Sequence, residues 1–455
     1  MRKSYIGNMR DYAIKNLDRF GITPFRHILG PALFRSAAPG PVHAATLLTP
    51  EVVFWLMMTA ALAQRSMRGA ITAFWALFRA DLPFLPAEPV TEEAFCIARK
   101  KLKLGFFRTV FQTVIRRYQQ RFDHAYRWQG FRLLGIDGMK LTLPPSPKLK
   151  HYFTTAANQQ GAGSSAQGLL VGLVGLWNGV CYGFKLTSGK GSEQACARKL
   201  IRRQVGASDL LMCDRNFPDY HTLALLQSRG AHYLFHLQAN RYTTLPARAT
   251  ASGRPEEWYV DLPIPPRLAE DPSELPATLT ARILRYQRIG FRPSWLITSL
   301  LDTAGYPYEE LVSLYHERWR QETMHREWKY SLSLSRLRSV SVPGIFKEVY
   351  VQLTLNNVVR WLMSDGADQG HCRPVDLKFL DCKRLILSSV SALSAVAPQI
   401  MPKLYQRLIV ELSTQKICFR PGRRYPRRND FRLRNKGHGK QVLPAQLLPT
   451  ERRAM

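Results

Sequence analysis

Acidic residues are scarce in this chain. Only 33 Asp and Glu stand against 65 Lys and Arg among 455 residues, which leaves a formal net charge of +32. The basic excess spans the whole chain, so nucleic acid is the expected partner, bound more weakly as the salt concentration rises. A ribosomal-type RNA binder and a protein that binds an anionic membrane surface are the alternatives at this level.

The chain also lacks paired or clustered cysteines and long apolar runs. The seven Cys residues are dispersed, with no C-x2-C pair and no Cys/His cluster, which argues against a structural zinc site. The most apolar stretch, Val52–Ala63, is shorter than the roughly 20 residues that span a bilayer, and the basic N-terminus lacks an apolar signal segment. We therefore expect a protein of a reducing compartment that makes no membrane contact. Its 45% hydrophobic residues suffice for about two or three packed domains.

The first part of the chain, residues 1–128, is expected to form a helical DNA-binding domain. Helix starts are indicated at Thr49-Pro50, Ser66 and Thr91. Two helices joined near Leu104-Gly105, with a basic face, would form an element like a helix-turn-helix. A helical bundle with a solvated basic side is the alternative. The residues expected to contact DNA here are Arg99, Lys100, Lys101 and Arg116.

Beyond residue 128 the pattern changes to strands. An apolar run at 131–144 predicts a buried strand, and Asn178-Gly179 predicts a hairpin between the next two strands. Helices and strands then alternate, which is typical of a mixed sheet with helices on its faces. The predicted fold class is therefore α/β. The strands are expected at 131–144, 167–178, 179–189, 207–217 and 232–238.

The later segments differ in composition. Residues 240–292 are rich in Pro, Thr and Arg with short β-like pieces, and predict a β-rich insertion into the sheet domain. The sheet domain would then comprise 129–239 and 293–365. A helical region is expected at 366–419, followed by an Arg-rich basic tail at 420–455.

Three acidic residues occupy special places in this pattern. Asp137 stands inside the first apolar strand, where an unpaired charge is costly. Asp214 ends the fourth strand, and ligands of α/β sheets bind at strand ends. Glu322 lies on a helix after the strand SWLITSLL. Converging carboxylates suit Mg²⁺, and two such ions can activate a water or 3′-hydroxyl and stabilise the leaving oxygen. Taken singly, each acid could instead cap a turn or form an ion pair.

Around Glu322 the chain reads Tyr315-x2-Arg318-x3-Glu322-x6-Lys329. At about 100° per residue, a regular helix places these four side chains at about 0°, −60°, −20° and −40°. They would share one narrow stripe, in which the acid holds a metal and the cations hold phosphate oxygens. A solvated helix with scattered ion pairs is the alternative.

These residues resemble the DDE transposases of bacterial insertion sequences, specifically the insertion-sequence-four family. That family is recognised by Y-x2-R-x3-E-x6-K, which matches at all four positions. The segments GIDGMKLTLP and LLMCDRNFPDYHTLALLQSRGAHYLFHLQ resemble its first-Asp and second-Asp segments. The resemblance implies a ribonuclease-H-like core, interrupted by the β-rich insertion, that carries out cut-and-paste transposition.

The resemblance also implies roles for individual residues. The metal ligands would be Asp137, Asp214 and Glu322, holding two Mg²⁺ ions for which Mn²⁺ can substitute. Phosphates near the scissile bond would be gripped by Tyr315, Arg318 and Lys329. Trp295 would stack on a base flipped out of the transposon end; a core Trp is the alternative.

The partners implied are double-stranded DNA, as transposon ends and target, and a second copy of the chain on that DNA. The expected location is the bacterial cytoplasm, in association with the nucleoid. A non-enzymatic basic nucleic-acid-binding protein is the alternative from another class, but it leaves Asp137 unexplained. A nuclease or an inactive descendant of the same fold is also open.

Overall fold

A computed structural model describes most of the chain. The elements below belong to the first of two compact units, Met1–Lys416. The predicted basic tail and much of the predicted insertion lie outside the described residues. The described ranges are 25, 27–38, 46–63, 66–78, 85–158, 161–238, 250–251, 256–265, 276–287, 293–395 and 399–418.

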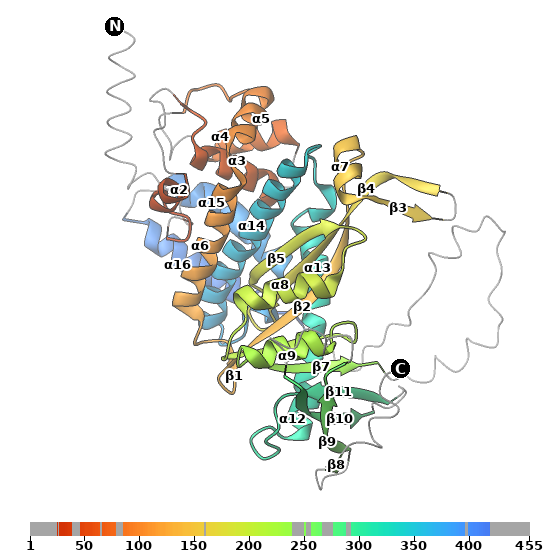
Figure 1. Ribbon diagram of the computed structural model, residues 1–455. Helices are drawn as coiled ribbons and strands as arrows, with labels where there is room; N and C mark the ends of the chain where they lie inside the picture. Colours follow the sequence, from red (N-terminus) through yellow and green to blue (C-terminus); the bar gives the residue numbers. More distant parts are fainter. Residues whose placement is uncertain are drawn as a thin grey trace, which may run out of the picture. The chain divides into compact units, whose positions relative to one another are not determined.

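A mixed sheet forms the centre of this unit (Figure 1), which confirms the predicted α/β class. The strand order is β3-β4-β2-β6-β7-β11-β10-β9-β8, with β1 on β2 and β5 on β4. The pairs β2–β6 and β6–β7 are parallel, and the remaining pairs are antiparallel. The strands are β1 Arg127–Trp128, β2 Phe131–Thr142, β3 Thr155–Asn158, β4 Gly161–Gly175, β5 Cys181–Ser188, β6 Asp209–Cys213, β7 His232–Leu237, β8 Thr250–Ala251, β9 Glu257–Pro263, β10 Thr278–Tyr286 and β11 Ser294–Thr298.

The predicted hairpin is present between β4 and β5. Gly179 has a φ of +74°, and the Asn178 side chain accepts a hydrogen bond from the Val180 N–H at 3.0 Å. The sequence did not predict β3, nor that β4 begins as early as Gly161. The segment that forms them is rich in small and polar residues, so it lacks the alternation of apolar and polar residues that marks a strand.

Strands from the predicted insertion extend the central sheet. Within the described residues, β8, β9 and β10 join it through β11, which pairs with both β10 and β7. A fully buried ion pair, Arg282–Glu257 at 2.7 Å, links β10 to β9, and Arg282 also donates to the Tyr306 carbonyl at 2.7 Å. A charge so deeply buried needs this complete set of partners. These strands therefore do not form a sheet of their own.

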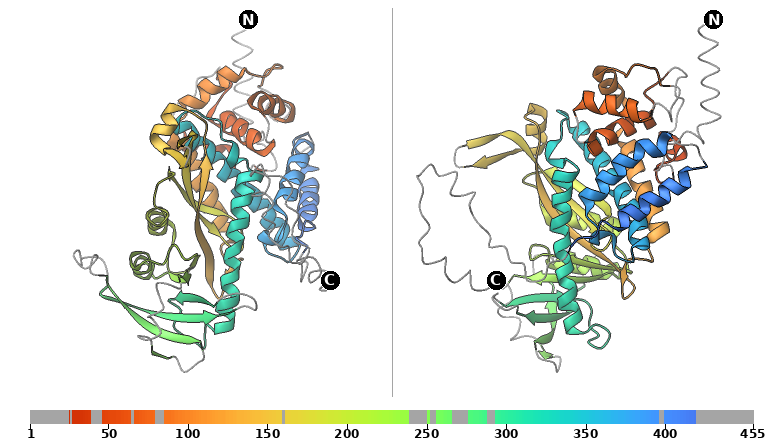
Figure 2. Two further views of the ribbon diagram at one scale, coloured as in Figure 1. Left: turned by 90° about the vertical axis from the view of Figure 1, so that its right-hand side faces the viewer. Right: turned by 180° about the vertical axis from the view of Figure 1, so that it is seen from behind.

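Two sets of helices cover opposite faces of the sheet. Asp137 approaches His325 of α13 at 3.6 Å, whereas a side chain at the next residue, Gly138, would meet Glu193 of α8. Successive residues of a strand point to opposite faces, so α13 and α8 lie on different sides of β2, as the edge-on view in Figure 2 shows. The bounds are α8 Glu193–Gln204, α9 Tyr220–Ser228 and α13 Arg320–Arg326.

The predicted helix starts in the N-terminal region are confirmed. The side chains of Thr49, Ser66 and Thr91 each accept a hydrogen bond from the backbone N–H three residues later, at 3.3, 3.1 and 3.2 Å. These bonds satisfy donors that the first helical turn leaves free. The helices are α2 Pro31–Ala37, α3 Pro50–Ala63, α4 Met67–Phe78, α5 Glu92–Lys101 and α6 Leu104–Phe122.

The long helix α14, Val342–Gln369, packs against α6. Tyr118 of α6 shares a hydrogen bond of 2.8 Å with Ser364, and Arg121 pairs with Asp365 at 2.7 Å. The second helix of the predicted helix-turn-helix is α6, which is 19 residues long. Its contacts with α14 show that it buries its apolar face within a helical bundle. The other helices are α7 Pro147–Phe153, α15 Phe379–Ala395 and α16 Met401–Ser413. No helix in the described ranges has the length and apolarity needed to cross a membrane.

Candidate active site

The register of two parallel strands brings Asp137 and Asp214 together. Arg132 of β2 lies beside Asp209 of β6, an offset of 77 residues that holds as far as Gly135 beside Met212. Asp137 and Asp214 differ by the same 77 residues, and they are close enough for the charge of Asp214 to help raise the pKa of Asp137. Asp214 directly follows β6, and its carboxylate accepts a hydrogen bond from the Asn216 N–H at 2.9 Å.

Asp137 is a largely buried acid that forms no salt bridge with a Lys or Arg of the described residues, although the charge of Arg318 acts on it. Its carboxylate accepts a hydrogen bond from the Gly138 N–H at 2.8 Å and lies 3.6 Å from His325 Nδ1. Burial is the main cause that raises the pKa of Asp137 to about 7, and the charges of Asp214 and Glu193 add to this shift. Burial also lowers the pKa of His325 to about 4, so its imidazole is uncharged at neutral pH. A bound cation would favour the ionised form of Asp137, and the uncharged imidazole would not repel that cation.

The segment with the predicted stripe, here called the signature run, is helical from Tyr308 to Ser331 but not regular. It consists of α12 Tyr308–Tyr315, a 3₁₀ turn His316–Trp319, α13 and a π-helical turn Glu327–Ser331. A 3₁₀ turn has fewer residues per turn than an α-helix and a π turn has more. The straight stripe expected from a regular helix is therefore wrong in detail, although all four residues lie on this run.

Tyr315 is buried, and its hydroxyl is already used. It donates to the carbonyl of Cys213 at 3.3 Å, and its ring stacks on His236 with centroids 6.0 Å apart. Burial raises the pKa of the Tyr315 phenol well above its usual value. This contact ties the signature run to the end of β6, directly before Asp214.

Arg318 and Glu322 form an ion pair on the signature run. Arg318 Nη2 donates to Glu322 Oε1 at 3.2 Å; Arg318 is 9% exposed, while the Glu322 side chain is 56% exposed. Arg318 Nε is buried without a hydrogen-bond partner in the described structure, which leaves one strong donor unfilled beside the carboxylates. Lys329 is half-buried. Burial is the main cause that lowers the pKa of His325, and the positive charge of Lys329 is the second cause.

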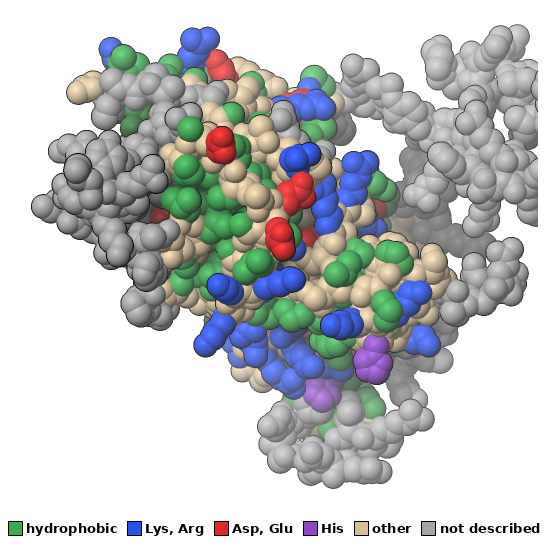
Figure 3. Space-filling view, turned by 90° about the horizontal axis from the view of Figure 1, so that it is seen from above, with side chains coloured by type: hydrophobic (Ala, Val, Ile, Leu, Met, Phe, Trp, Pro, Cys, Tyr) green, Lys and Arg blue, Asp and Glu red, His purple; other side chains and the backbone are tan. Residues whose placement is uncertain are grey.

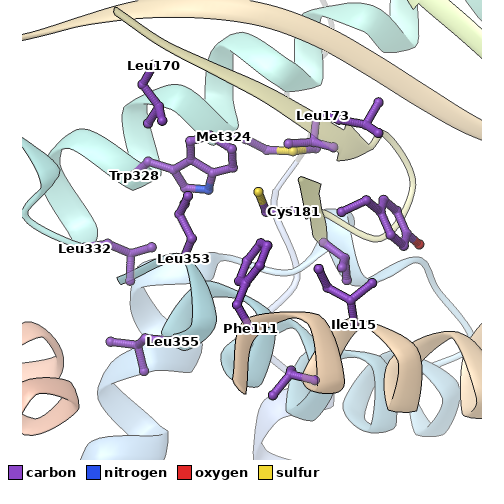
Figure 4. Close-up of a cluster of buried hydrophobic side chains, with 14 of the residues drawn as sticks. Phe111, Ile115, Leu170, Leu173, Cys181, Met324, Trp328, Leu332, Leu353 and Leu355 are labelled. Carbon is purple, nitrogen blue, oxygen red and sulfur yellow. The ribbon is translucent and has the colours of Figure 1, made fainter. Parts of the chain in front are cut away.

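A glycine allows the signature run to lie close against the sheet. Gly172 of β4 pairs with Asp137, and a Cβ at Gly172 would lie 2.7 Å from the ring of Trp328. Trp328 is fully buried and donates from its indole N–H to Asn356 at 3.1 Å. Figure 4 shows Trp328 and its neighbour Met324 pointing into the apolar core. The helix that carries Glu322 is thus held against the strand next to Asp137.

The predicted metal ligands do not form a closed cluster. No three His, Cys, Asp or Glu side chains in the described ranges converge in a geometry ready to hold a metal ion. Asp137 and Asp214 interact electrostatically, but the Glu322 carboxylate is turned toward Arg318. The donor set itself consists of the hard oxygen ligands that Mg²⁺ prefers.

The predicted DNA-contacting residues of α5 and α6 are divided between two environments. Lys100, Lys101 and Arg116 are exposed, but Arg99 is largely buried and pairs with Glu348 at 3.3 Å. On the face of the molecule seen in Figure 3, Lys and Arg side chains outnumber Asp and Glu.

Trp295 is half-buried on β11. Its ring lies 5.5 Å from that of Trp258, with the Arg285 guanidinium 5.9 Å above it. Its neighbour Leu296 pairs with His236, which stacks on Tyr315. Because successive strand residues alternate in direction, Trp295 points to the face of the sheet opposite Tyr315.

Glu193 lies beside the site but was not predicted from the sequence. Glu193 is the first residue of α8, and its charge adds to the raised pKa of Asp137. An acid in the first turn of a helix is a routine feature, so the sequence Ser192-Glu193 indicated only a helix start.

This chain is similar to known transposases. The family described as Transposase DDE domain matches residues 128–357, which include Asp137, Asp214 and Glu322. Transposase InsG for insertion sequence element IS4, from Escherichia coli (strain K12), is 25% identical over 392 residues, covering 83% of this chain and 84% of that protein. The solved piggyBac transposase synaptic complex with hairpin DNA matches with a TM-score of 0.41 and 12% identity, covering 88% of this chain and 85% of that one. This chain therefore belongs to the family described as Transposase DDE domain.

Proposed function

We propose that this chain binds the terminal inverted repeats of its own element, cuts the DNA there and joins the cut ends to a target. The observation that supports this proposal is the register between β2 and β6, whose offset of 77 residues also separates Asp137 from Asp214, the residue directly after β6. We infer a ribonuclease-H-like core from this arrangement. Two acids on adjacent parallel strands then face a third, Glu322, on a helix fixed against the same sheet.

The carboxylates fit divalent cations. Asp137 is buried beside two other negative charges, and the imidazole next to it is neutral, so a bound cation would relieve a real electrostatic cost. We assign Asp137, Asp214 and Glu322 as ligands of two Mg²⁺ ions, with Mn²⁺ as a substitute. When bound, such a pair activates a water or a 3′-hydroxyl and stabilises the leaving oxygen. Glu322 would turn away from Arg318 to take this role.

Arg318 and Lys329 would then serve the DNA phosphates. Once Glu322 engages a cation, the guanidinium of Arg318 gains a free edge in addition to its unfilled Nε. Arginine suits phosphate because its planar donors match two oxygens at once. For Tyr315 we propose positioning in place of the phosphate contact, since its hydroxyl is occupied by the Cys213 carbonyl.

We propose that basic side chains outside the active site also bind DNA. The net charge of +32 and the exposed Lys100, Lys101 and Arg116 support binding of double-stranded DNA, whereas Arg99 would contribute less because it is paired. Two ends must be joined in one event, so we propose that two copies of the chain act together on DNA. We also propose that Trp295 stacks on a base flipped out of the transposon end.

The test is incubation of the full chain with a duplex that carries the terminal repeat and with a target plasmid, in Mg²⁺. A transposase cuts at the repeat and joins the cut end to the plasmid. Cutting without joining would indicate a nuclease of the same fold. Binding without cutting in either Mg²⁺ or Mn²⁺ would contradict the proposal and favour a non-enzymatic DNA-binding protein or an inactive descendant.

A further inference from the structure

The carboxylate of Glu193 occupies a place that a side chain on β2 would otherwise fill. A Cβ at Gly138 would lie 2.5 Å from Glu193 Oε1 and 2.7 Å from Glu193 Cδ. Gly138 directly follows Asp137 and donates its N–H to the Asp137 carboxylate. The glycine thus leaves room for a second acid beside the first, and this acid arrives from α8, on the face of the sheet opposite α13.

Two other carboxylates lie close enough to Glu193 to interact with it electrostatically. Burial and then the charge of Asp214 raise the pKa of Glu193. Lys140 acts on it electrostatically, but in the described part of the chain no Lys, Arg or His lies within salt-bridge distance of either Glu193 or Asp214. Three carboxylates therefore share one region in which the described cations Lys140 and Arg318 act on them without forming a salt bridge to any of the three.

A second observation indicates a ligand at this place. Arg318 is nine-tenths buried, its Nε has no partner in the described structure, and its charge acts on both Asp137 and Asp214. A buried guanidinium with an open donor, close to two carboxylates to which it is not hydrogen-bonded, suits a ligand that brings cations and anionic oxygens together. Divalent cations bound to phosphate have this composition.

Glu193 could have the purely structural role of stabilising the start of α8, and Glu92 holds the equivalent position at the start of α5. Acids in the first turn favour helices through the helix dipole. Glu193 follows the N-cap Ser192 on α8 in the same way as Glu92 follows the N-cap Thr91 on α5. Glu92 is exposed, whereas Glu193 reaches back over Gly138. Glu92 therefore serves as a control: its substitution removes a helix-start acid without changing the region around Asp137.

We propose that Glu193 is a fourth carboxylate of the metal site: from the α8 side it would reach a divalent cation that Asp137 and Asp214 hold where β6 ends. This inference rests on the proposed function, because it assumes that the aligned aspartates hold metal. It adds a metal-binding residue outside the signature run and outside both aspartate segments.

The test measures Mn²⁺ binding by the full chain, without DNA, by calorimetry and by the electron paramagnetic resonance signal of free Mn²⁺. Glu193→Gln should weaken binding by about tenfold or more, as loss of a group that supports a metal does. Gly138→Ala should also weaken it, because the new methyl group displaces the carboxylate without removing its charge. Glu92→Gln, the matched control, should bind as the unsubstituted chain does. Thermal melting without metal checks that each variant folds.

A second readout is the Mg²⁺ concentration needed for half-maximal DNA cleavage. It should rise about tenfold or more in Glu193→Gln, with activity recovering at high Mg²⁺, whereas Glu92→Gln should leave it unchanged. Mn²⁺ affinity within twofold of normal in folded Glu193→Gln would overturn the proposal. If that variant does not fold, normal affinity in Gly138→Ala would overturn it. Failure of Asp137→Asn to weaken Mn²⁺ binding would instead contradict the proposed metal site itself.

Discussion

Asp137 and His325 lie 3.6 Å apart, yet they do not form an ion pair at neutral pH. Burial lowers the pKa of the imidazole to about 4, so the His325 ring is neutral while the Asp137 carboxylate stays close to the charges of Asp214 and Glu193. When Asp137 is ionised, its charge lies beside those of Asp214 and Glu193 and is offset in part by Arg318, so the ionised form costs stability that a bound cation would restore.

Removal of this charge should stabilise the metal-free protein. Asp137→Asn, measured by chemical denaturation in EDTA at pH 8, should raise the free energy of unfolding by about 1–3 kcal/mol, because the amide needs no counter-charge. Asp261→Asn is the control: Asp261 is exposed and bonded to Thr280, so its change should be near zero. A loss of stability in Asp137→Asn would show that the carboxylate is satisfied by the protein itself.

The close contact at Gly172 should couple packing to catalysis. Gly172→Ala places a methyl group against the rigid indole of Trp328, and should cost about 1–3 kcal/mol of stability. DNA cleavage should fall further than stability explains, because the helix that carries Glu322 moves. Gly206→Ala, where no atom lies within 4 Å of the new Cβ, is the matched control. The double variant Gly172→Ala/Trp328→Phe should recover part of the stability and part of the cleavage, and no recovery would refute the coupling.

Tyr315 should act through structure. In Tyr315→Phe the Cys213 carbonyl loses its donor, which should cost about 0.5–1.5 kcal/mol in a denaturation experiment. Cleavage of a terminal-repeat duplex should stay within a few-fold of normal at a temperature where the variant is folded. A large loss of cleavage without loss of stability would restore the phosphate contact that the sequence predicted.

The basic residues of α5 should differ in their effects. Lys100→Ala/Lys101→Ala should reduce the slope of log affinity for DNA against log salt concentration by about 2, because each lysine would neutralise one DNA phosphate. Arg99→Ala should leave this slope unchanged and lower the melting temperature, because Arg99 pairs with Glu348. An unchanged slope in the double variant would place the main DNA contacts elsewhere.

The sequence predicted those features that depend on local pattern. Alternating strands and helices, the turn at Asn178-Gly179 and the caps at Thr49, Ser66 and Thr91 each follow from a few adjacent residues. The special positions of Asp137 and Asp214 were also visible, because a charge inside or directly after an apolar strand is conspicuous.

Features that depend on long-range contacts were not predicted. The irregular turns of the signature run coincide with contacts to distant elements, such as the Tyr315 bond to Cys213 and the Trp328 bond to Asn356. Nothing in the sequence near Arg99 indicates its pairing with Glu348, 249 residues away. Glu193 was missed for the same reason, since its closeness to Gly138 arises only when α8 packs on the sheet.

The most direct test of the account compares cleavage and binding in three variants of the full chain. Asp137→Asn, Asp214→Asn and Glu322→Gln should each lose cleavage of a terminal-repeat duplex in Mg²⁺ by roughly a thousandfold or more. Each should bind the same duplex within about threefold of normal, because the basic surface that dominates affinity is unchanged. Glu309→Gln, an exposed change on α12, should leave both unaffected. Near-normal cleavage by any one of the three variants would contradict the assignment of that residue, and near-normal cleavage by all three would contradict the metal site.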